Sequence, residues 1–292
     1  MSESGVIIPV DSPLHSTLSR LAGDSRMVFC TGLPGVGKSL LINQLAHIGQ
    51  ARGRTIHLLQ WDVCRQPFEA SAEAQAAFPE IDGVTHPAVR TAVGIWARTA
   101  IEQWHKTHVD PKNLLIGEMS LVGDRLMSLL RRIDDPIEQT LADNKTKFVT
   151  PVPTHEVRRV IEASREERSS DPKHEREQSD AVPAVMRSLW EDLYRVAYDL
   201  KIIDRIPEVG KNGYDPDIYG GMFAALMKHR NHEILSIDTT FDTQGRSVYD
   251  LDIPVKELIP SAIDVEVCIA KVLEQYPTAS ELDQHVQQWY LV

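Results

Sequence analysis

The chain has 292 residues, of which 42% are hydrophobic and 25% are charged, as is usual for a globular protein that folds around its own core. Its formal net charge of −11 disfavours an extended surface for nucleic acid or anionic membranes. The N-terminus has no basic segment followed by an apolar run, and no stretch approaches about 18 consecutive apolar residues. We therefore expect a cytoplasmic protein with neither a nucleic-acid nor a membrane partner.

Apolar runs of strand length alternate with helical patterns along the chain. The strand-like runs cover residues 27–30, 54–61, 112–118, 147–152 and 233–238. The helical patterns cover residues 14–21, 39–50, 70–77, 86–108, 123–133, 136–142, 262–276 and 280–290. Strands that are joined by helices pair in parallel. The order therefore predicts a single α/β domain over residues 1–292, with a doubly wound, mainly parallel five-stranded sheet and helices on both faces.

A glycine-rich loop joins the first strand to the helix that follows it. It matches the pattern G-x-x-x-x-G-K-[ST], in which backbone N–H groups surround phosphates, the lysine bridges two phosphates and the hydroxyl ligates Mg²⁺. The glycines allow the backbone to approach the phosphates closely. The residues expected to contact the nucleotide are Gly32, Leu33, Pro34, Gly35, Val36, Gly37, Lys38, Ser39 and Leu40. The loop thus predicts a site for nucleotide phosphates and Mg²⁺.

Two carboxylates follow strands of the predicted sheet. Ligands of such sheets bind at the carboxyl ends of the strands, which places both carboxylates at the edge that carries the loop. Asp62, after the second strand, could accept a proton from a substrate hydroxyl, hold Mg²⁺ through water or merely cap the next helix. Glu118, at the end of the third strand, could bind Mg²⁺ through water, accept a hydrogen bond from the substrate or mark the strand's exit to solvent.

Three arginines are candidates for binding a phosphate acceptor. Arg65 lies three residues after Asp62 and could clamp an anionic group, or it could be an ordinary surface arginine. Arg90 and Arg125 are further candidates for a substrate phosphate or carboxylate. Residues 66–110, between the second and third strands, are expected to form the acceptor pocket.

Residues 154–181 are rich in charge although they lie between two core strands. From residue 162 to residue 181 there is no Val, Leu, Ile, Met, Phe, Tyr or Trp, so this part should stay outside the core. Such a helical excursion is typical of a lid, whose arginines neutralise the transferring phosphoryl group while closure excludes water. A solvated helix with pairs such as Arg158 and Glu162 is the alternative. The arginines of this segment are Arg158, Arg159, Arg165, Arg168 and Arg176, of which Arg165 and Arg168 share one face.

Residues 255–292 follow the last predicted strand. Their two helical patterns predict a C-terminal appendage that packs on the domain. The same helices could instead meet a partner subunit, which would allow a homodimer.

The chain resembles the P-loop kinases of the nucleoside monophosphate and small-molecule kinase superfamily over about residues 27–240. The resemblance rests on GLPGVGKS, on the carboxylate in WDVCR, on the arginine-rich VRRVIEASREER and on the strand EILSID. The D-x-x-R spacing of Asp62 and Arg65 is similar to that of adenylylsulfate kinases and zeta-toxin-type kinases, where the aspartate lies close to the acceptor hydroxyl.

The resemblance implies a role for several residues. Lys38 and Ser39 would carry ATP and Mg²⁺, and Asp62 would be the base or the orienting group, with Mg²⁺ shared between Ser39 and Asp62. Arg165 and Arg168 would act from the lid. The third strand ends in GEMS and lacks both the glycine triplet of shikimate kinases and the Asp-Arg of thymidylate kinases, so the acceptor stays open.

The leading expectation is an ATP-dependent phosphotransferase that moves the γ-phosphoryl group to a hydroxyl or phosphate of a small metabolite such as a nucleoside or nucleotide. The alternative is a P-loop nucleotide-binding regulator or ATPase without an acceptor. A lid that excludes water suits transfer better than hydrolysis.

Overall fold

The computed structural model describes residues 5–80, 84–170, 174, 177, 183–208, 213–243 and 245–292, apart from the side chains at positions 73, 166–170, 183 and 184. The strands are β1 (Met27–Thr31), β2 (Thr55–Gln60), β3 (Asn113–Met119), β4 (Thr146–Pro153), β5 (His232–Ile237) and β6 (Val255–Glu257). The helices are α1 (Pro13–Asp24), α2 (Lys38–Ala51), α3 (Trp61–Cys64), α4 (Gln66–Ala70), α5 (Ala72–Ala77), α6 (Pro87–Thr107), α7 (Glu138–Ala142), α8 (His155–Ser170), α9 (Pro183–Asp199), α10 (Pro216–Leu226), α11 (Ala262–Gln275) and α12 (Ala279–Gln287). Two 3₁₀ turns follow β3, namely η1 (Val122–Asp124) and η2 (Met127–Leu129).

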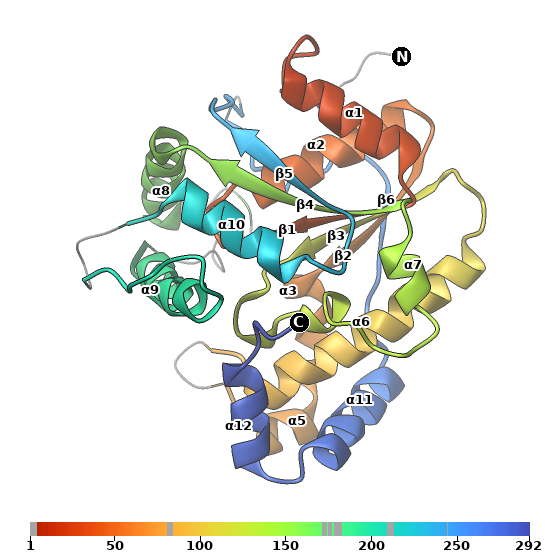
Figure 1. The fold of residues 1–292 in the computed structure, drawn as a ribbon. Helices are drawn as coiled ribbons and strands as arrows, with labels where there is room; N and C mark the ends of the chain where they lie inside the picture. The colour runs from red at the N-terminus through yellow and green to blue at the C-terminus, as the bar shows by residue number, and fades with distance from the viewer. Residues whose placement is uncertain are drawn as a thin grey trace.

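The strands form one six-stranded sheet in the order β5-β4-β1-β3-β2-β6, and every pair is parallel (Figure 1). The predicted α/β class and all the predicted strands are confirmed. The strand number was wrong by one, because β6 is only three residues long and was assigned to the C-terminal appendage. It pairs with β2 at the sheet edge.

Helices cover both faces of the sheet. Along β1, Met27 and Phe29 face a core that includes α6, α10 and the C-terminal helices, whereas Val28 and Cys30 face a core with α1 and α2. This alternation follows from the two-residue period of a strand. β1 is central, and the chain passes from β3 to β4 across it, so the carboxyl ends of these strands flank the crevice in which such sheets bind ligands.

The predicted helix over 123–133 was wrong. Leu121, Asp124 and Leu126 have φ of 58°, 72° and 58°, left-handed values that an α-helix does not contain. Two carbonyls of this segment accept hydrogen bonds from guanidinium groups: Arg98 donates to the carbonyl of Ser128 and Arg230 to that of Leu129. Two isolated 3₁₀ turns, η1 and η2, result.

The C-terminal helices were predicted correctly and form α11 and α12. Each begins with a capping box, built from Ser261 and Asp264 in α11 and from Thr278 and Glu281 in α12. Both pack against α6, on the far side of the molecule from α1 and α2 (Figure 1). Helices α9 and α10 were not among the expected elements.

In the part of the chain that the structure describes, none of the helices has both the length and the apolar character needed to cross a bilayer.

Candidate active site

The glycine-rich loop connects β1 to α2 through left-handed glycines. Gly32, Gly35 and Gly37 have φ of 137°, 76° and 92°, a conformation that side chains disfavour. Gly37 is the N-cap of α2, and this cap makes no side-chain hydrogen bond to the first turn. The backbone N–H groups that begin α2 are therefore the donors that a helix N-terminus offers to an anion.

Side chains from distant elements hold the loop in this shape. Tyr219 of α10 accepts a hydrogen bond from the backbone N–H of Leu33 at 3.2 Å. Arg158 of α8 is only 4% exposed and donates to the carbonyls of Pro34 and Gly35, both at 3.1 Å. Lys38 donates to the carbonyl of Leu33 at 2.9 Å. The loop is thus supported by side chains of α2, α8 and α10.

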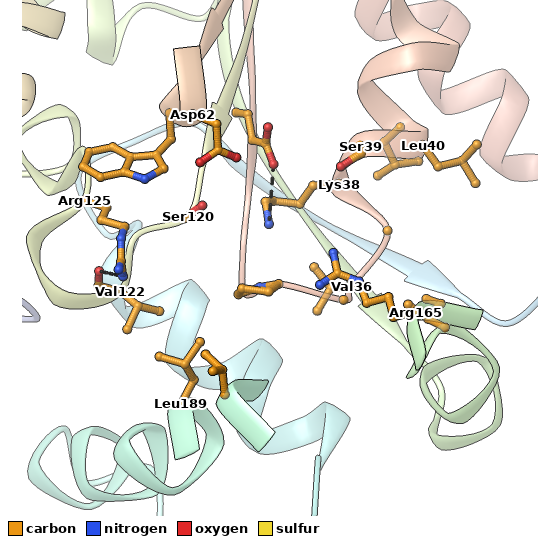
Figure 2. Close-up of a pocket in the computed structure, with 18 of the residues that line it drawn as sticks. Val36, Lys38, Ser39, Leu40, Asp62, Ser120, Val122, Arg125, Arg165 and Leu189 are labelled. Carbon is orange, nitrogen blue, oxygen red and sulfur yellow. Dashed lines mark hydrogen bonds and ion pairs between the residues drawn. The ribbon is translucent and has the colours of Figure 1, made fainter. Parts of the chain in front are cut away.

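A carboxylate of the neighbouring strand lies beside the loop lysine. Parallel register places Glu118 of β3 opposite Cys30 of β1, directly before the loop. Its carboxylate lies 3.9 Å from the Lys38 ammonium, and the two side chains are 12% and 5% exposed (Figure 2). The predicted position of Glu118 at the loop edge is confirmed.

A cavity of about 1460 Å³ opens beside the loop. Its wall combines the loop, the ends of β2 and β3, α8, α9, the segment after β5 and the C-terminal residues 287–290. Figure 2 shows Lys38 and Ser39 on one side of this space, with Asp62, Ser120 and Arg125 across from them. The predicted candidates that line it are Pro34, Gly35, Val36, Gly37, Lys38, Ser39, Leu40, Asp62, Arg65, Arg90, Glu118, Arg125 and Arg165.

Two loop residues lie beneath the cavity instead of in its wall. Leu33 is buried in the core, and Gly32 stands so close to Tyr219 that an added Cβ would lie 2.3 Å from the phenol oxygen. Their contribution is the shape of the loop.

The serine of the loop contacts the segment that follows β5. The Ser39 hydroxyl lies 3.4 Å from the phenol oxygen of Tyr249, and Asn43, one turn along α2, donates to the carbonyls of Val248 and Asp250. This crossing segment runs from β5 towards β6 at the opposite sheet edge. It therefore borders the position from which Ser39 would ligate a metal.

Asp62 and Arg65 belong to a local ion-pair network. Arg65 donates to Asp62 at 3.2 Å and to both oxygens of Glu69 at 2.7 Å, and Thr85 also donates to Glu69. The Asp62 side chain remains 50% exposed and lines the cavity. Asp62 can therefore still reach a ligand, whereas the charge of Arg65 is largely compensated inside the protein.

Arg90 and Arg125 converge on the same wall from α6 and from the loop after β3. Arg125 lies over the ring of Trp61, with 5.8 Å between guanidinium carbon and ring centroid. Burial, and then the charges of Arg90 and Arg65, lower the pKa of Arg125 to about 10. The structure thus brings together arginines that lie far apart in the sequence.

The predicted helix of the 154–181 segment is present as α8, and its Arg158–Glu162 pair forms at 2.7 Å. Arg165 lines the cavity, whereas Arg159 is exposed. The side chain of Arg168 and the whole of Arg176 lie outside the described residues. The expectation that residues 162–181 avoid burial was wrong for Glu177, which is 3% exposed and accepts a hydrogen bond from Ser247 at 2.7 Å.

The residues present suit a nucleotide with Mg²⁺. Mg²⁺ is usually held by one or two carboxylates, water and substrate phosphates, not by a cage of protein ligands. Ser39, Glu118 and Asp62 all line the cavity beside the loop, and the described residues contain no cluster of three or more His, Cys, Asp or Glu that could hold a metal by itself. This donor set fits a metal that arrives with phosphates.

Sequence reasoning missed the contacts of Tyr219, Tyr249 and residues 287–290 with the site. These residues carry no local motif, since only the folded chain brings them to the loop.

Comparisons with protein-family models, curated proteins and solved structures find no match to this chain. Its chemistry is therefore judged from its own residues.

Proposed function

We propose that this protein is an ATP-dependent phosphotransferase of the P-loop kinase type, which moves the γ-phosphoryl group to a hydroxyl or phosphate of a small metabolite. One observation carries the proposal: the G-x-x-x-x-G-K-[ST] loop opens onto a cavity that is also lined by carboxylates and arginines from other elements of the fold. The parallel sheet with the loop after its central strand supports it.

Each group of the cavity has a task in such a transfer. The backbone N–H groups of the loop and the Lys38 ammonium bind the donor phosphates, and Ser39 with Glu118 would hold Mg²⁺, which would neutralise phosphate charge. Asp62 accepts the proton of the acceptor hydroxyl while the hydroxyl oxygen bonds to the γ-phosphorus. The bond between the γ-phosphorus and the bridging oxygen of the β-phosphate breaks, which leaves ADP. Arg165 stabilises negative charge on the phosphoryl oxygens.

The test is formation of ADP from MgATP in the presence of panels of hydroxyl-bearing metabolites, compared between wild type and Lys38→Met. We expect acceptor-dependent ADP formation that the substitution removes, because the lysine charge contacts the phosphates. Lys112→Met, at an exposed position before β3, is the matched control and should behave as wild type. ADP release that no acceptor stimulates would favour an ATPase or regulator, and absence of ATP binding by the wild type would refute both.

A further inference from the structure

Two arginines of the cavity wall bond only to neutral partners. Arg90 donates to the carbonyl of Gly123 at 2.6 Å, and Arg125 donates to the carbonyl of Val122 at 3.1 Å. Among the described residues, no carboxylate lies within 4.0 Å of either guanidinium group, in contrast to Arg65 with its two acidic partners. Among the described residues, these two guanidinium groups therefore line the cavity without a directly bonded carboxylate.

The charges of Asp124 and Asp283 offset the burial of Arg90 only in part, because its pKa stays below the ordinary value. The Nε of Arg90 is buried and finds no hydrogen-bond partner in the part of the chain that the structure describes. The nearest acidic side chain in sequence, Asp124, is directed elsewhere: it accepts from Thr91 at 2.9 Å and pairs with Arg131 at 2.8 Å. A buried cation without its counter-charge is costly, and an arriving anion removes that cost.

The remaining charges near the pair reinforce this arrangement. Arg65 and Arg90 both lower the pKa of Arg125, after the larger effect of burial. Asp62 and Glu69 act in the opposite direction, but both are bonded to Arg65. The wall therefore keeps a positive excess, although the whole chain carries a net charge of −11.

Uncharged hydrogen-bonding groups complete this part of the cavity. Ser120 and Thr85 line it, and the turn η1 that precedes Arg125 contacts α12, whose C-terminal end contributes Gln287. Such a mixture of a few charged groups with neutral donors and acceptors is typical of pockets for small polar ligands.

We infer that Arg90 and Arg125 form an anion subsite and that the phosphate acceptor is a small metabolite bearing a phosphate or a carboxylate group. The role as acceptor rests on the proposed phosphotransferase function, whereas the anion site itself does not. Guanidinium groups bind either anion through paired, charge-assisted hydrogen bonds. Trp61, beneath Arg125, limits how far that guanidinium can retreat from the ligand.

The binding test uses isothermal titration of inorganic phosphate and, separately, of acetate into full-length Lys38→Met protein, in which the phosphate loop is weakened as a competing anion site. Introducing Arg125→Met, or in a separate protein Arg90→Met, should weaken binding of the preferred anion about tenfold or more, because each removes a charge-assisted hydrogen-bond donor. Arg195→Met is the matched control: it lines the same cavity but pairs with Asp192 at 3.2 Å, and it should leave binding unchanged. The anion that binds more tightly identifies a phosphate or a carboxylate ligand.

Equal anion binding by Arg125→Met, Arg90→Met and the control, with thermal melts showing all variants folded, would overturn the anion subsite. Arg125→Lys guards against a folding defect: it retains the charge but not the paired hydrogen bonds, so it should weaken binding less than Arg125→Met does. In turnover with MgATP, the Michaelis constant of an anionic acceptor should rise in Arg125→Met while that of ATP stays constant. Turnover of neutral acceptors only would overturn the acceptor class and leave the phosphotransferase standing, whereas anion binding without any turnover would support the subsite and refute the phosphotransferase.

Discussion

The guanidinium of Arg158 donates a hydrogen bond to the carbonyl of Gly35, 3.1 Å away, and so joins helix α8 to the glycine-rich loop. The same side chain stacks on the ring of Tyr214 and contacts the sulfur of Met186 in α9. Helices α8 and α9 are thus packed onto the outside of the loop, and their position and the loop's shape depend on each other. Arg158 is a positioning residue, because its contacts are with the loop backbone.

Replacing Arg158 by methionine should weaken nucleotide binding. The substitution leaves two loop carbonyls without their donor, and loss of a buried hydrogen bond costs about 1–3 kcal/mol, which corresponds to about 5- to 150-fold in affinity. The measurement is the dissociation constant of MgADP, together with the melting temperature. Arg159→Met is the matched control, because Arg159 is the exposed neighbour in α8. Identical MgADP affinity in both variants would show that the loop keeps its shape without Arg158.

Tyr219→Phe should destabilise the fold although it removes only one oxygen atom. The phenol accepts a hydrogen bond from the buried N–H of Leu33, and a buried donor left without a partner costs about 1–3 kcal/mol. The measurement is the free energy of unfolding in urea. Tyr198→Phe, at an exposed position of α9, should change it by less than about 0.5 kcal/mol. A loss no larger than that of Tyr198→Phe would mean that another group satisfies the N–H.

The sheet and the position of the glycine-rich loop could be predicted because local sequence determines them. The strands are visible in the sequence as apolar runs. The loop is recognisable because it has glycines at its left-handed positions, followed by Lys38 and Ser39 at fixed spacing. Because ligands of parallel sheets bind at the carboxyl ends of the strands, Asp62 and Glu118 were expected beside the loop. The structure confirms this position for Glu118, whose carboxylate lies beside the ammonium of Lys38.

The remaining features depend on contacts between distant segments. The 123–133 segment has a helical apolar pattern, but Arg98 and Arg230 bind its carbonyls and divide it into turns. Arg158 looks like any solvated arginine in the sequence, since only α9 and the loop bury it. Such long-range partners cannot be predicted from a local sequence pattern.

Glu118→Gln and Asp62→Asn should separate metal binding from proton transfer. Glu118 is the carboxylate that lies 3.9 Å from Lys38, so its loss should lower turnover and raise the Mg²⁺ concentration needed for half-maximal activity. Asp62 is bonded to Arg65 and is the proposed base. Its loss should therefore lower turnover by about 10²-fold or more and leave the Mg²⁺ requirement unchanged. Steady-state turnover measured against free Mg²⁺ distinguishes the two. A reversed pattern would assign the metal to Asp62, and wild-type turnover in Asp62→Asn would exclude it as the base.

Glu138 should make stability depend on pH below about 5. Burial by itself would raise its pKa, but hydrogen bonds from Arg230 and Arg98 outweigh this effect and lower the pKa to about 2 from an ordinary 4.5. Because the folded-state pKa is the lower one, the stabilisation is complete above the ordinary value and is lost as the pH falls from 4.5 towards 2. The shift corresponds to about 3 kcal/mol at neutral pH.

Glu138→Gln tests this linkage and the support of the segment after Arg125 together. Arg230 and Arg98, the partners of Glu138, also bind the backbone of the segment that follows Arg125. The variant should be destabilised by about 3 kcal/mol at pH 7, and the difference from wild type should shrink towards pH 2. Urea unfolding across this pH range provides the measurement. Glu102→Gln, which removes only a surface pair with Lys106, should cost less than about 1 kcal/mol. A difference for Glu138→Gln that stays constant with pH would mean that the carboxylate's charge does not stabilise the folded protein.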